Sequence, residues 1–428
     1  MKVLHLSTDD NSGGASRSAY RLHQALSEQS VESSMRVLRH DTANARVLSG
    51  RIPRTLQKKI VDRIKKQIWE FSIRNWRTEN PIMHTFGNTS AGLVTEINQS
   101  SSQLVNLHWI TDLLSIQDIG EINKPIVWTV HDMWVFCGGE HSTPDTPEAR
   151  FREGYLSSNR PLTESGPDLN RHAWETKRAA WANQAITFVA PSRWMGTCIK
   201  ESALFRNADI DVHVVPNPID AETVWRPIDK RQARARLGLN PDNHYLLVGS
   251  AGGMSSIKGE DMVGPIMQKL TSHTKNAIEL IVFGTTSPAL TQNLTGRVHL
   301  MGRVTNDVVM ADLYSAADVM MIPSRQDNLP NTAIEAQACG VPVVGFNIGG
   351  VPDIVVHGRG GWVAPSFDLD DFAKGVDWLL ENKERYLEIA AFSRNYAVNN
   401  FAAKVVADRY IQVYEKVLAG HMPKKAMG

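Results

Sequence analysis

The chain has 428 residues, of which 42% are hydrophobic and 21% are charged, and its formal net charge is +1. This length predicts about two to three domains with sizeable cores, and the balanced charge excludes a field that would recruit nucleic acid. The cysteines stand far apart and predict neither a disulfide framework nor a metal site. We expect a cytoplasmic protein, because the sequence shows no apolar run of about twenty residues and no signal-peptide pattern. The three cysteines are Cys137, Cys198 and Cys339.

The first predicted unit is a strand, a glycine pair and a helix. A buried strand over 3–7 is followed by a polar turn, Gly13 and Gly14, and a helix over 15–27. Such a unit lets the backbone approach a phosphate, although the spacing is not that of a dinucleotide fingerprint. A bare tight turn is the alternative interpretation of the two glycines.

Residues 51–77 form a basic, amphipathic pattern that only Asp62 and Glu70 oppose. Apolar residues recur every four positions between lysines and arginines, with tryptophans at 69 and 76. A helix of this kind lies in an anionic membrane surface, or else packs its apolar face into a core and leaves its basic face in solvent. The sequence leaves both open and permits peripheral contact with the cytoplasmic face of a membrane.

Two further apolar runs, over 104–109 and 125–130, predict buried parallel strands of one sheet. The second ends at His131, where open α/β sheets bind ligands; a core histidine bonded to a loop is the alternative. His108 stands in a similar position on the first of these strands. The stretch 138–170 is polar and rich in turn residues, so we expect a mobile functional loop, or disorder.

The second half begins after a joint over 212–220 that contains two prolines. A strand over 245–249 leads into a glycine-rich loop that ends at Lys258, and Gly259 opens the next helix. A cation beside a helix N-terminus suits a phosphate, so Lys258 is predicted to bind one. A surface lysine without a ligand is the alternative.

The most informative stretch is 323–350, PSRQDNLPNTAIEAQACGVPVVGFNIGG. A strand over 319–322 precedes a polar turn and a helix from about 330 to 339. The helix start offers backbone N–H groups to an anion, and Asn331 and Thr332 add donors. Glu335, one turn further in, suits ribose hydroxyls, and Asp327 in the turn is placed to reach a second hydroxyl-rich group. These side chains together predict a ligand with both a phosphate and sugars.

Asp327, seven further residues, Glu335 and then Ala-Gln-Ala-Cys-Gly-Val-Pro-Val resemble the donor-site signature of retaining GT-B glycosyltransferases of the family 4 type. The Asp-Asn-Leu-Pro-Asn sub-pattern over 327–331 supports the resemblance. The family's first acidic residue is commonly Glu, so Asp327 departs by one methylene. A Rossmann-like strand and helix with an incidental glutamate is the alternative.

The resemblance implies an α/β fold with two Rossmann-like parallel-sheet domains facing across a cleft. The acceptor-side domain would cover 1–221 and the donor-binding domain 222–402, with the C-terminal helix 403–419 packing back onto the first. The implied reaction moves a sugar from a UDP- or GDP-sugar to a hydroxyl of a glycan or lipid-linked acceptor in surface polysaccharide synthesis. No metal and no cofactor would be required, because the nucleotide sugar is a substrate.

The resemblance also implies roles for individual residues. The catalytic residues would be His131, Asp327 and Lys258. The donor-binding residues would be Gly13, Gly14, Lys258, Asn328, Leu329, Asn331, Thr332 and Glu335. The acceptor side would include Ser16, Arg17 and His108. The family commonly has an arginine five residues before the lysine, where this chain has Gly253. Either half of the usual diphosphate clamp is missing, or Arg325, Arg303 or Arg193 replaces it.

Three rival functions remain open from the sequence. One is a nucleotide-sugar epimerase of the same architecture, which needs no acceptor. Another is a glycogen-type synthase or phosphorylase acting on a soluble glucan. The third is a nucleotide-sugar sensor or scaffold without turnover, for which Gly253 in place of arginine is the only indication.

Overall fold

The computed structural model describes residues 1–52, 67, 69–270, 277–287, 290, 294 and 296–421. Most of the predicted amphipathic helix at 51–77 therefore lies outside the described residues. The chain divides into two compact units. Unit 1 consists of Met1–Pro191, Met195–Val215 and Tyr410–Gly428, and unit 2 of Ser192–Trp194 and Pro216–Arg409. The boundary predicted from the sequence fell between 221 and 222.

Unit 1 is built on a parallel sheet of seven strands. Its central strands are buried on both faces, which matches their continuous apolar sequences. The strands, in their order across the sheet, are β3 (Val47–Ser49), β2 (Glu32–Arg39), β1 (Lys2–Asp9), β4 (Leu104–Leu107), β5 (Ile126–Thr129), β6 (Ile186–Ala190) and β7 (Asp211–Val214).

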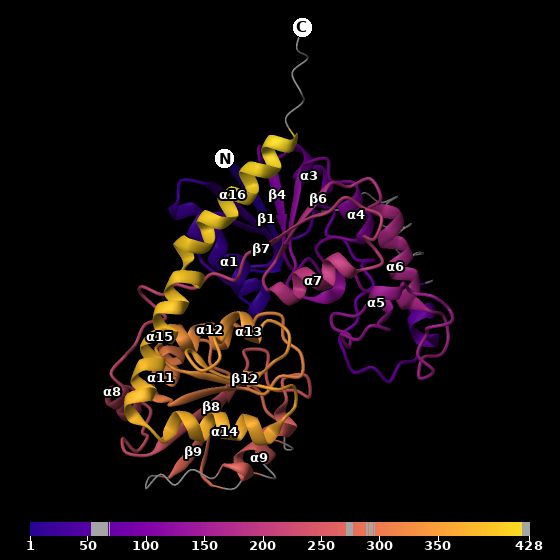
Figure 1. Cartoon of the computed structure of the whole chain (residues 1–428). Helices are drawn as coiled ribbons and strands as arrows, with labels where there is room; N and C mark the ends of the chain where they lie inside the picture. The colour runs from indigo at the N-terminus through magenta and orange to yellow at the C-terminus, as the bar shows by residue number, and fades with distance from the viewer. Residues whose placement is uncertain are drawn as a thin grey trace. The chain divides into compact units, whose positions relative to one another are not determined.

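Several helices surround this sheet, and the end of the last helix of the chain also packs on it (Figure 1). They are α1 (Gly13–Glu28), α3 (Val94–Gln99), α4 (Ile116–Gly120), the 3₁₀ turn η1 (Met133–Val135), α5 (Arg150–Glu153), α6 (Leu169–Ala180), α7 (Arg193–Glu201) and α16 (Ala403–His421). Asn106 Nδ2 donates to the hydroxyl of Tyr414 at 2.6 Å, and the hydroxyls of Thr129 and Tyr410 lie 3.0 Å apart. These buried bonds fix α16 against β4 and β5, because either partner left alone would be an unsatisfied polar group.

Unit 2 contains a second parallel sheet, of six strands. In order across the sheet they are β10 (Val298–Gly302), β9 (Ile278–Phe283), β8 (His244–Gly249), β11 (Val319–Ile322), β12 (Val343–Phe346) and β13 (Gly361–Ala364). The helices are α8 (Lys230–Arg236), α9 (Glu260–Lys269), α11 (Asp307–Ala316), α12 (Asn331–Ala338), α13 (Val351–Ile354), α14 (Leu369–Leu380), α15 (Lys383–Phe401) and the first part of α16.

The helices of unit 2 cover both faces of its sheet (Figure 1). One core cluster contains Trp225 and Tyr314 and lies beneath α8, α11 and α12. The other contains Phe346 and Phe372 and lies beneath α9 and α14. The unit is thus a three-layer α/β arrangement, as predicted from its alternating strands and helices.

A buried ionic network holds α8 against the start of β11. Asp318 accepts hydrogen bonds from Lys230 at 2.6 Å, from Arg234 at 2.8 Å and from the backbone N–H of Tyr245 at 2.8 Å. Burial opposes the charge on Asp318, but Lys230, His244 and Arg234 outweigh it and hold the pKa of this carboxyl far below its usual range. Asp318 is therefore ionised and fully paired in the folded protein.

The structure corrects one prediction for unit 1 and adds strands in both units that were not predicted. The stretch 138–170 is not structureless, because it contains α5 and buries Phe151 and Tyr155. Arg150 holds it in place by an ion pair with Asp168 at 2.8 Å. Strands β2, β3, β7 and β13 were not predicted; β7 overlaps the stretch 212–220 that was predicted as a joint.

Candidate nucleotide-sugar site

Each sheet has a point where the order of its strands reverses. In unit 2 the chain runs outward from β8 to β9 and β10, and then from β11 to β12 and β13 on the other side. The loops that follow β8 and β11 therefore diverge, and open parallel sheets bind ligands in the crevice between such loops. These loops are residues 250–259 and 323–330, the two segments that the sequence predicted to bind the donor. In unit 1 the same reversal falls between β1 and β4.

Lys258 and Asp327 face each other across the reversal point of unit 2. The Nζ of Lys258 lies 2.5 Å from Oδ2 of Asp327, and the hydroxyl of Ser324 lies 3.5 Å from the same oxygen. The Lys258 side chain is 32% exposed and that of Asp327 is 11% exposed. Each was predicted to be functional, but the sequence did not predict that they form an ion pair. The lysine keeps two further N–H donors for a ligand.

Arg325 holds these two loops together. Its backbone N–H donates to the carbonyl of Ile257 at 2.7 Å, and its guanidinium donates to the carbonyl of Ser256 at 2.7 Å. The guanidinium also forms a bidentate pair with Asp261, at 2.6 and 2.7 Å, which lowers the pKa of that carboxyl. Arg325 thus positions the loop that presents Lys258.

Gly253 occupies the position where an arginine was expected. Its φ is +92°, and a Cβ there would overlap the hydroxyl of Thr285. An arginine at this place would therefore be strained and would clash. Of the proposed replacements, Arg325 is bound to Asp261, and Arg193 is paired with Asp353 at 2.7 Å. The third, Arg303, is exposed just beyond β10.

Glu335 lies on the buried side of α12 and is 5% exposed. Its Oε2 accepts a hydrogen bond from the hydroxyl of Tyr314, a fully buried residue of α11, at 2.9 Å. This bond fixes the orientation of the carboxylate. Tyr314 could not be recognised from the sequence, because its position in α11 carries no motif.

The other predicted donor residues lie around the turn before α12. Asn328 Oδ1 accepts from the hydroxyl of Ser192 at 2.8 Å, and Asn331 Oδ1 accepts from Asn217 Nδ2 at 2.9 Å. Thr332 is partly exposed on the first turn of α12. The side chain of Leu329 is buried in the core, so it contributes packing.

In unit 1, Gly13 and Gly14 begin α1 just beyond the carboxyl end of β1, as predicted. Arg17 is partly exposed on α1. Ser16 is fully buried one turn before Ala19, on the face of α1 that packs inward, and not on an open acceptor surface.

His131 is partly exposed just beyond β5, whereas His108 is 3% exposed and deeper in the unit. His108 uses both ring nitrogens within the protein, with His5 Nδ1 at 3.0 Å from its Nε2 and His131 Nε2 at 3.2 Å from its Nδ1. The prediction that His108 contacts an acceptor therefore needs correction, since its ring has no nitrogen left. Burial lowers the pKa of His131 to about 4, so its imidazole is neutral at neutral pH.

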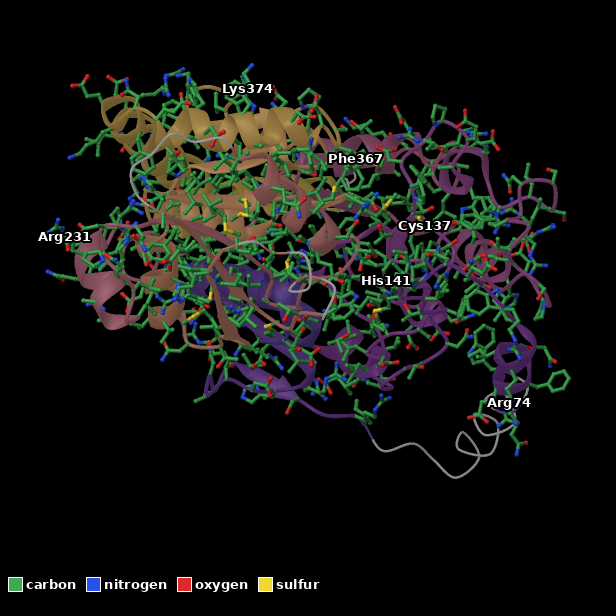
Figure 2. All side chains as sticks on the ribbon, turned by 90° about the horizontal axis from the view of Figure 1, so that it is seen from below. Arg74, Cys137, His141, Arg231, Phe367 and Lys374 are labelled. Carbon is green, nitrogen blue, oxygen red and sulfur yellow. The ribbon has the colours of Figure 1, made fainter. Side chains whose placement is uncertain are left out.

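A second histidine, His141 (labelled in Figure 2), is bonded to Asp132, the residue that follows His131. Its Nδ1 lies 2.6 Å from Oδ2 of Asp132 and its Nε2 lies 2.7 Å from the hydroxyl of Thr85. Burial opposes ionisation of Asp132, but His141 and the backbone N–H of Trp134 outweigh it and lower the pKa of Asp132. This group could not be recognised from the sequence, because its members come from separate segments without a motif.

No set of three His, Cys, Asp or Glu side chains among the described residues is arranged to hold a metal ion. No helix in the described ranges combines the length and the apolar character that crossing a bilayer requires.

Residues 245–382, which include both loops of the candidate site, match the family model described as Glycosyl transferases group 1. Among curated proteins, the chain is 29% identical over 259 residues to D-inositol 3-phosphate glycosyltransferase 1 of Catenulispora acidiphila. That match covers 56% of this chain and 60% of the relative. The chain thus spans less than two thirds of this relative's length.

Solved structures resemble the whole chain. Anabaena Alr3699/HepE in complex with UDP and glucose has a TM-score of 0.65 at 15% identity, covering 97% of this chain and all of that one. Sucrose-phosphate synthase from Thermosynechococcus elongatus has a TM-score of 0.65 at 17% identity, covering 98% and 100%. These likenesses show the fold, which is that of GT-B glycosyltransferases, with two parallel-sheet α/β units.

Proposed function

We propose that this protein is a retaining glycosyltransferase of the family 4 type that takes its sugar from a nucleoside diphosphate donor. The observation that carries the proposal is the Lys258–Asp327 pair at the reversal point of unit 2, with the buried Glu335 on the helix that follows. A cation and two carboxylates at this place suit a ligand that combines a diphosphate with hydroxyl-rich sugars. The match of residues 245–382 to group 1 glycosyl transferases supports the same assignment.

The proposed reaction exchanges one bond at the anomeric carbon of the sugar. The bond to the diphosphate oxygen breaks, and a bond to the acceptor hydroxyl oxygen forms on the same face. The hydroxyl proton leaves with the nucleoside diphosphate. Negative charge develops on the leaving group, so fixed positive groups lower the barrier.

Each residue of the site then has a distinct role. Lys258 donates to the diphosphate with the N–H groups that Asp327 does not use, and the N-terminus of α12 adds backbone donors. Glu335, held by Tyr314, accepts from the ribose hydroxyls. Asp327 and His131 orient the transferred sugar. No metal enters this proposal.

The donor is proposed to be a UDP- or GDP-sugar, and the acceptor a hydroxyl of a glycan or a lipid-linked glycan in surface polysaccharide synthesis. UDP is the first nucleotide to test, because Anabaena HepE was solved with UDP and glucose. Pockets that discriminate between hexoses differ by a few hydroxyl contacts, so the sugar is left to experiment.

We also propose that the segment 51–77 brings the protein to the cytoplasmic face of a membrane. Its described end supports this, since residues 69–75 are helical and Phe71 and Ile73 are 71% and 41% exposed. Arg74 is exposed on the same segment (Figure 2). Exposed aromatic and basic side chains together suit an anionic lipid surface.

The test is a thermal-shift panel of nucleoside diphosphates and their sugar conjugates without metal, repeated on Glu335→Ala. A ligand at about a hundred times its dissociation constant stabilises the folded state by roughly 2.7 kcal/mol. The proposal is supported if the nucleotides of one base stabilise the wild type and this stabilisation is lost in the variant. It is contradicted if no nucleotide stabilises the wild type. NMR of the product made with an acceptor then reads the anomeric configuration. Conversion of the donor without an acceptor would indicate an epimerase instead.

A further inference from the structure

Two segments that are far apart in the sequence lie side by side in unit 1. Arg77 and Ser165 form an antiparallel bridge, in which each backbone N–H donates to the other's carbonyl at 3.1 Å. Gly166 packs so closely on Asn75 that a Cβ at this glycine would overlap the carbonyl oxygen of Asn75. The helix that ends at Asn75 is therefore fixed against the stretch 154–167, which follows α5 (Figure 1).

The helix at 69–75 presents an aromatic side chain to solvent. Trp69 and Trp76 stand about two helical turns apart, and both rings contact Phe86, at centroid distances of 5.3 and 5.4 Å. Phe71 lies on the opposite side of the helix and is exposed. The two tryptophans thus already attach the helix to the unit, and the ring of Phe71 has no part in that attachment.

An ordered turn holds a leucine out in solvent in the adjoining stretch. The side chain of Leu162 is fully exposed. The backbone N–H of Glu164 donates to the carbonyl of Pro161 at 3.0 Å and closes the turn around this leucine. Arg160 donates to the carbonyl of Gly166 at 2.8 Å and joins the two ends of the turn. The backbone on both sides of Leu162 is therefore fixed while its side chain lies in water.

Both segments expose further large apolar side chains. An ordered backbone that holds such side chains in water forgoes the stabilisation that their burial would give. An exposed apolar surface of this kind marks an interaction with a protein or a membrane. We refer to these side chains together as the docking surface, which consists of Phe71, Ile73, Met83, Leu156 and Leu162.

The charge near the docking surface indicates which partner it fits. Residues 51–66, which precede the helix, carry seven lysines and arginines against one aspartate. Arg74 (labelled in Figure 2) and Arg77 are exposed as well. The exposed carboxylates of Glu70 and Glu79 balance these two arginines, so the excess of positive charge comes from 51–66. Positive charge beside exposed aromatic and aliphatic side chains suits an anionic lipid surface.

The spacing of the apolar side chains favours a lipid surface over a protein partner. Serines, a proline and an asparagine separate Leu156 from Leu162. A protein partner buries a contiguous core that is packed as densely as a protein interior. A fluid lipid layer adapts to apolar side chains that stand apart from one another, because each inserts among the lipids separately.

We propose that the turn at 156–162 is a second membrane-contacting element, which inserts Leu156 and Leu162 into the headgroup region of an anionic bilayer beside the helix at 69–75. This inference rests on the membrane contact proposed for 51–77 and does not depend on sugar transfer. Two elements that are fixed against each other hold unit 1 at one angle to the membrane, whereas a single helix is free to rotate about its own axis.

The first experiment measures binding of the full chain to vesicles by co-sedimentation, without nucleotide or acceptor. The vesicles contain phosphatidylglycerol and phosphatidylcholine, and pure phosphatidylcholine is compared. We expect Leu162→Ser to lower the partition coefficient on the anionic vesicles by roughly three- to tenfold, because one leucine side chain no longer leaves water. Leu48→Ser is the matched control and should leave binding unchanged, since Leu48 lies on the edge strand β3 of the same unit and is 59% exposed.

Phe71→Ser separates this inference from the proposal on which it rests. If Phe71→Ser weakens vesicle binding and Leu162→Ser does not, the helix alone contacts the membrane and the second element is overturned. If the wild type binds no vesicles, both membrane proposals fail, while the glycosyltransferase assignment is decided by its own thermal-shift test. If Leu162→Ser dissociates a wild-type dimer and leaves vesicle binding unchanged, the surface joins two copies of the chain, which also overturns the inference.

The second experiment reads insertion at the turn directly. The three native cysteines are buried, so a thiol-reactive environment-sensitive dye labels a cysteine introduced at the surface. The dye on Leu162→Cys should brighten and shift to the blue when anionic vesicles are added, and less so at high salt, because salt screens the basic residues. The dye on Leu48→Cys should not respond. An unchanged spectrum of the Leu162→Cys conjugate while it is bound to vesicles would overturn insertion of the turn.

Discussion

The Nζ of Lys258 lies 2.5 Å from Oδ2 of Asp327, and the two residues come from the loops on either side of the strand reversal in unit 2. Arg325 ties these loops together through Ser256, Ile257 and Asp261. The cation is therefore held in place before any ligand arrives. Such preorganisation is what allows a charge to stabilise a leaving group without rearrangement.

Replacing Lys258 by alanine is expected to lower turnover more than donor affinity. Removal of one fixed group that stabilises developing charge typically lowers kcat by about 10²–10³-fold. Lys269→Ala is the matched control, since this lysine ends helix α9, the helix that follows the Lys258 loop, and pairs with the exposed Asp370 at 2.6 Å. Steady-state kinetics with saturating acceptor measure both variants. Equal turnover in Lys258→Ala and the wild type would remove Lys258 from the mechanism.

Glu335→Ala is expected to weaken donor binding by roughly 1–3 kcal/mol, because a buried hydrogen bond to a charged group is lost. Tyr314→Phe should weaken binding in the same direction but by less, since it only frees the carboxylate to turn. Calorimetric titration of the nucleoside diphosphate measures both, and the double variant tests their coupling. If the effects of the two substitutions simply add, Tyr314 does not act through Glu335.

The placement of the candidate donor-site residues around one turn could be predicted because strand, turn and helix follow one another directly at 319–338, and side chains close in sequence are then close in space. The pairings within the site could not be predicted. Lys258 is 69 residues from Asp327. The contact of His108 with both His5 and His131 likewise depends on β4 lying between β1 and β5. No local sequence pattern records that order of strands.

The sheets show the same limit. Strand β2 carries serines and arginines among its apolar residues, and two of these polar residues, Ser33 and Arg36, are buried. Its sequence therefore lacks the apolar run that identified β4 and β5. Within 138–170 the fold is held by polar contacts, such as Tyr155 donating to Glu140 at 3.0 Å. Hydrophobic periodicity does not record contacts of that kind.

Gly259→Ala tests whether the close approach of the two loops is needed for donor binding. Gly259 has a φ of +70°, and a Cβ there would overlap the carbonyl oxygen of Pro323. Gly238 is a matched control, with a φ of +68° and nothing within 4 Å of a Cβ. In both alanine variants, backbone strain should lower the free energy of unfolding by about 1 kcal/mol. Only Gly259→Ala should also reduce the thermal shift that the donor produces. Equal shifts in the two variants would contradict this role for the contact.

Asp318→Asn is expected to destabilise the protein by roughly 3–5 kcal/mol, because the buried charge of Arg234 and the partly exposed charge of Lys230 would both lose this counter-ion. The pKa of Asp318 is depressed in the folded state, so its contribution is complete above its unfolded pKa of about 3.9 and declines as the pH falls further. Urea unfolding at pH of about 7 and about 3 should therefore show a smaller difference from the wild type at the lower pH. Asp370→Asn, at an exposed ion pair, should cost less than about 1 kcal/mol.

Lys177 offers a test of pH dependence in unit 1. It is fully buried and donates to the backbone carbonyls of Trp134, of Cys137 at 3.0 Å and of Gly138 at 2.8 Å. Burial lowers its pKa from 10.5 to about 7. Between these values the unfolded chain binds more protons at this site than the folded one, so the contribution of Lys177 to stability rises as the pH increases through this window.

Lys177→Met should therefore lose stability relative to the wild type as the pH is raised from about 7 to about 10, because the wild type alone gains from release of this proton. Guanidinium unfolding at several pH values in that range measures the difference in the free energy of unfolding. Lys177→Arg serves as the second variant, since its side chain stays protonated throughout and should show no such gain over Lys177→Met. Parallel stability curves for the wild type and Lys177→Met would mean that the lysine remains charged in the folded protein, stabilised by its three carbonyl partners.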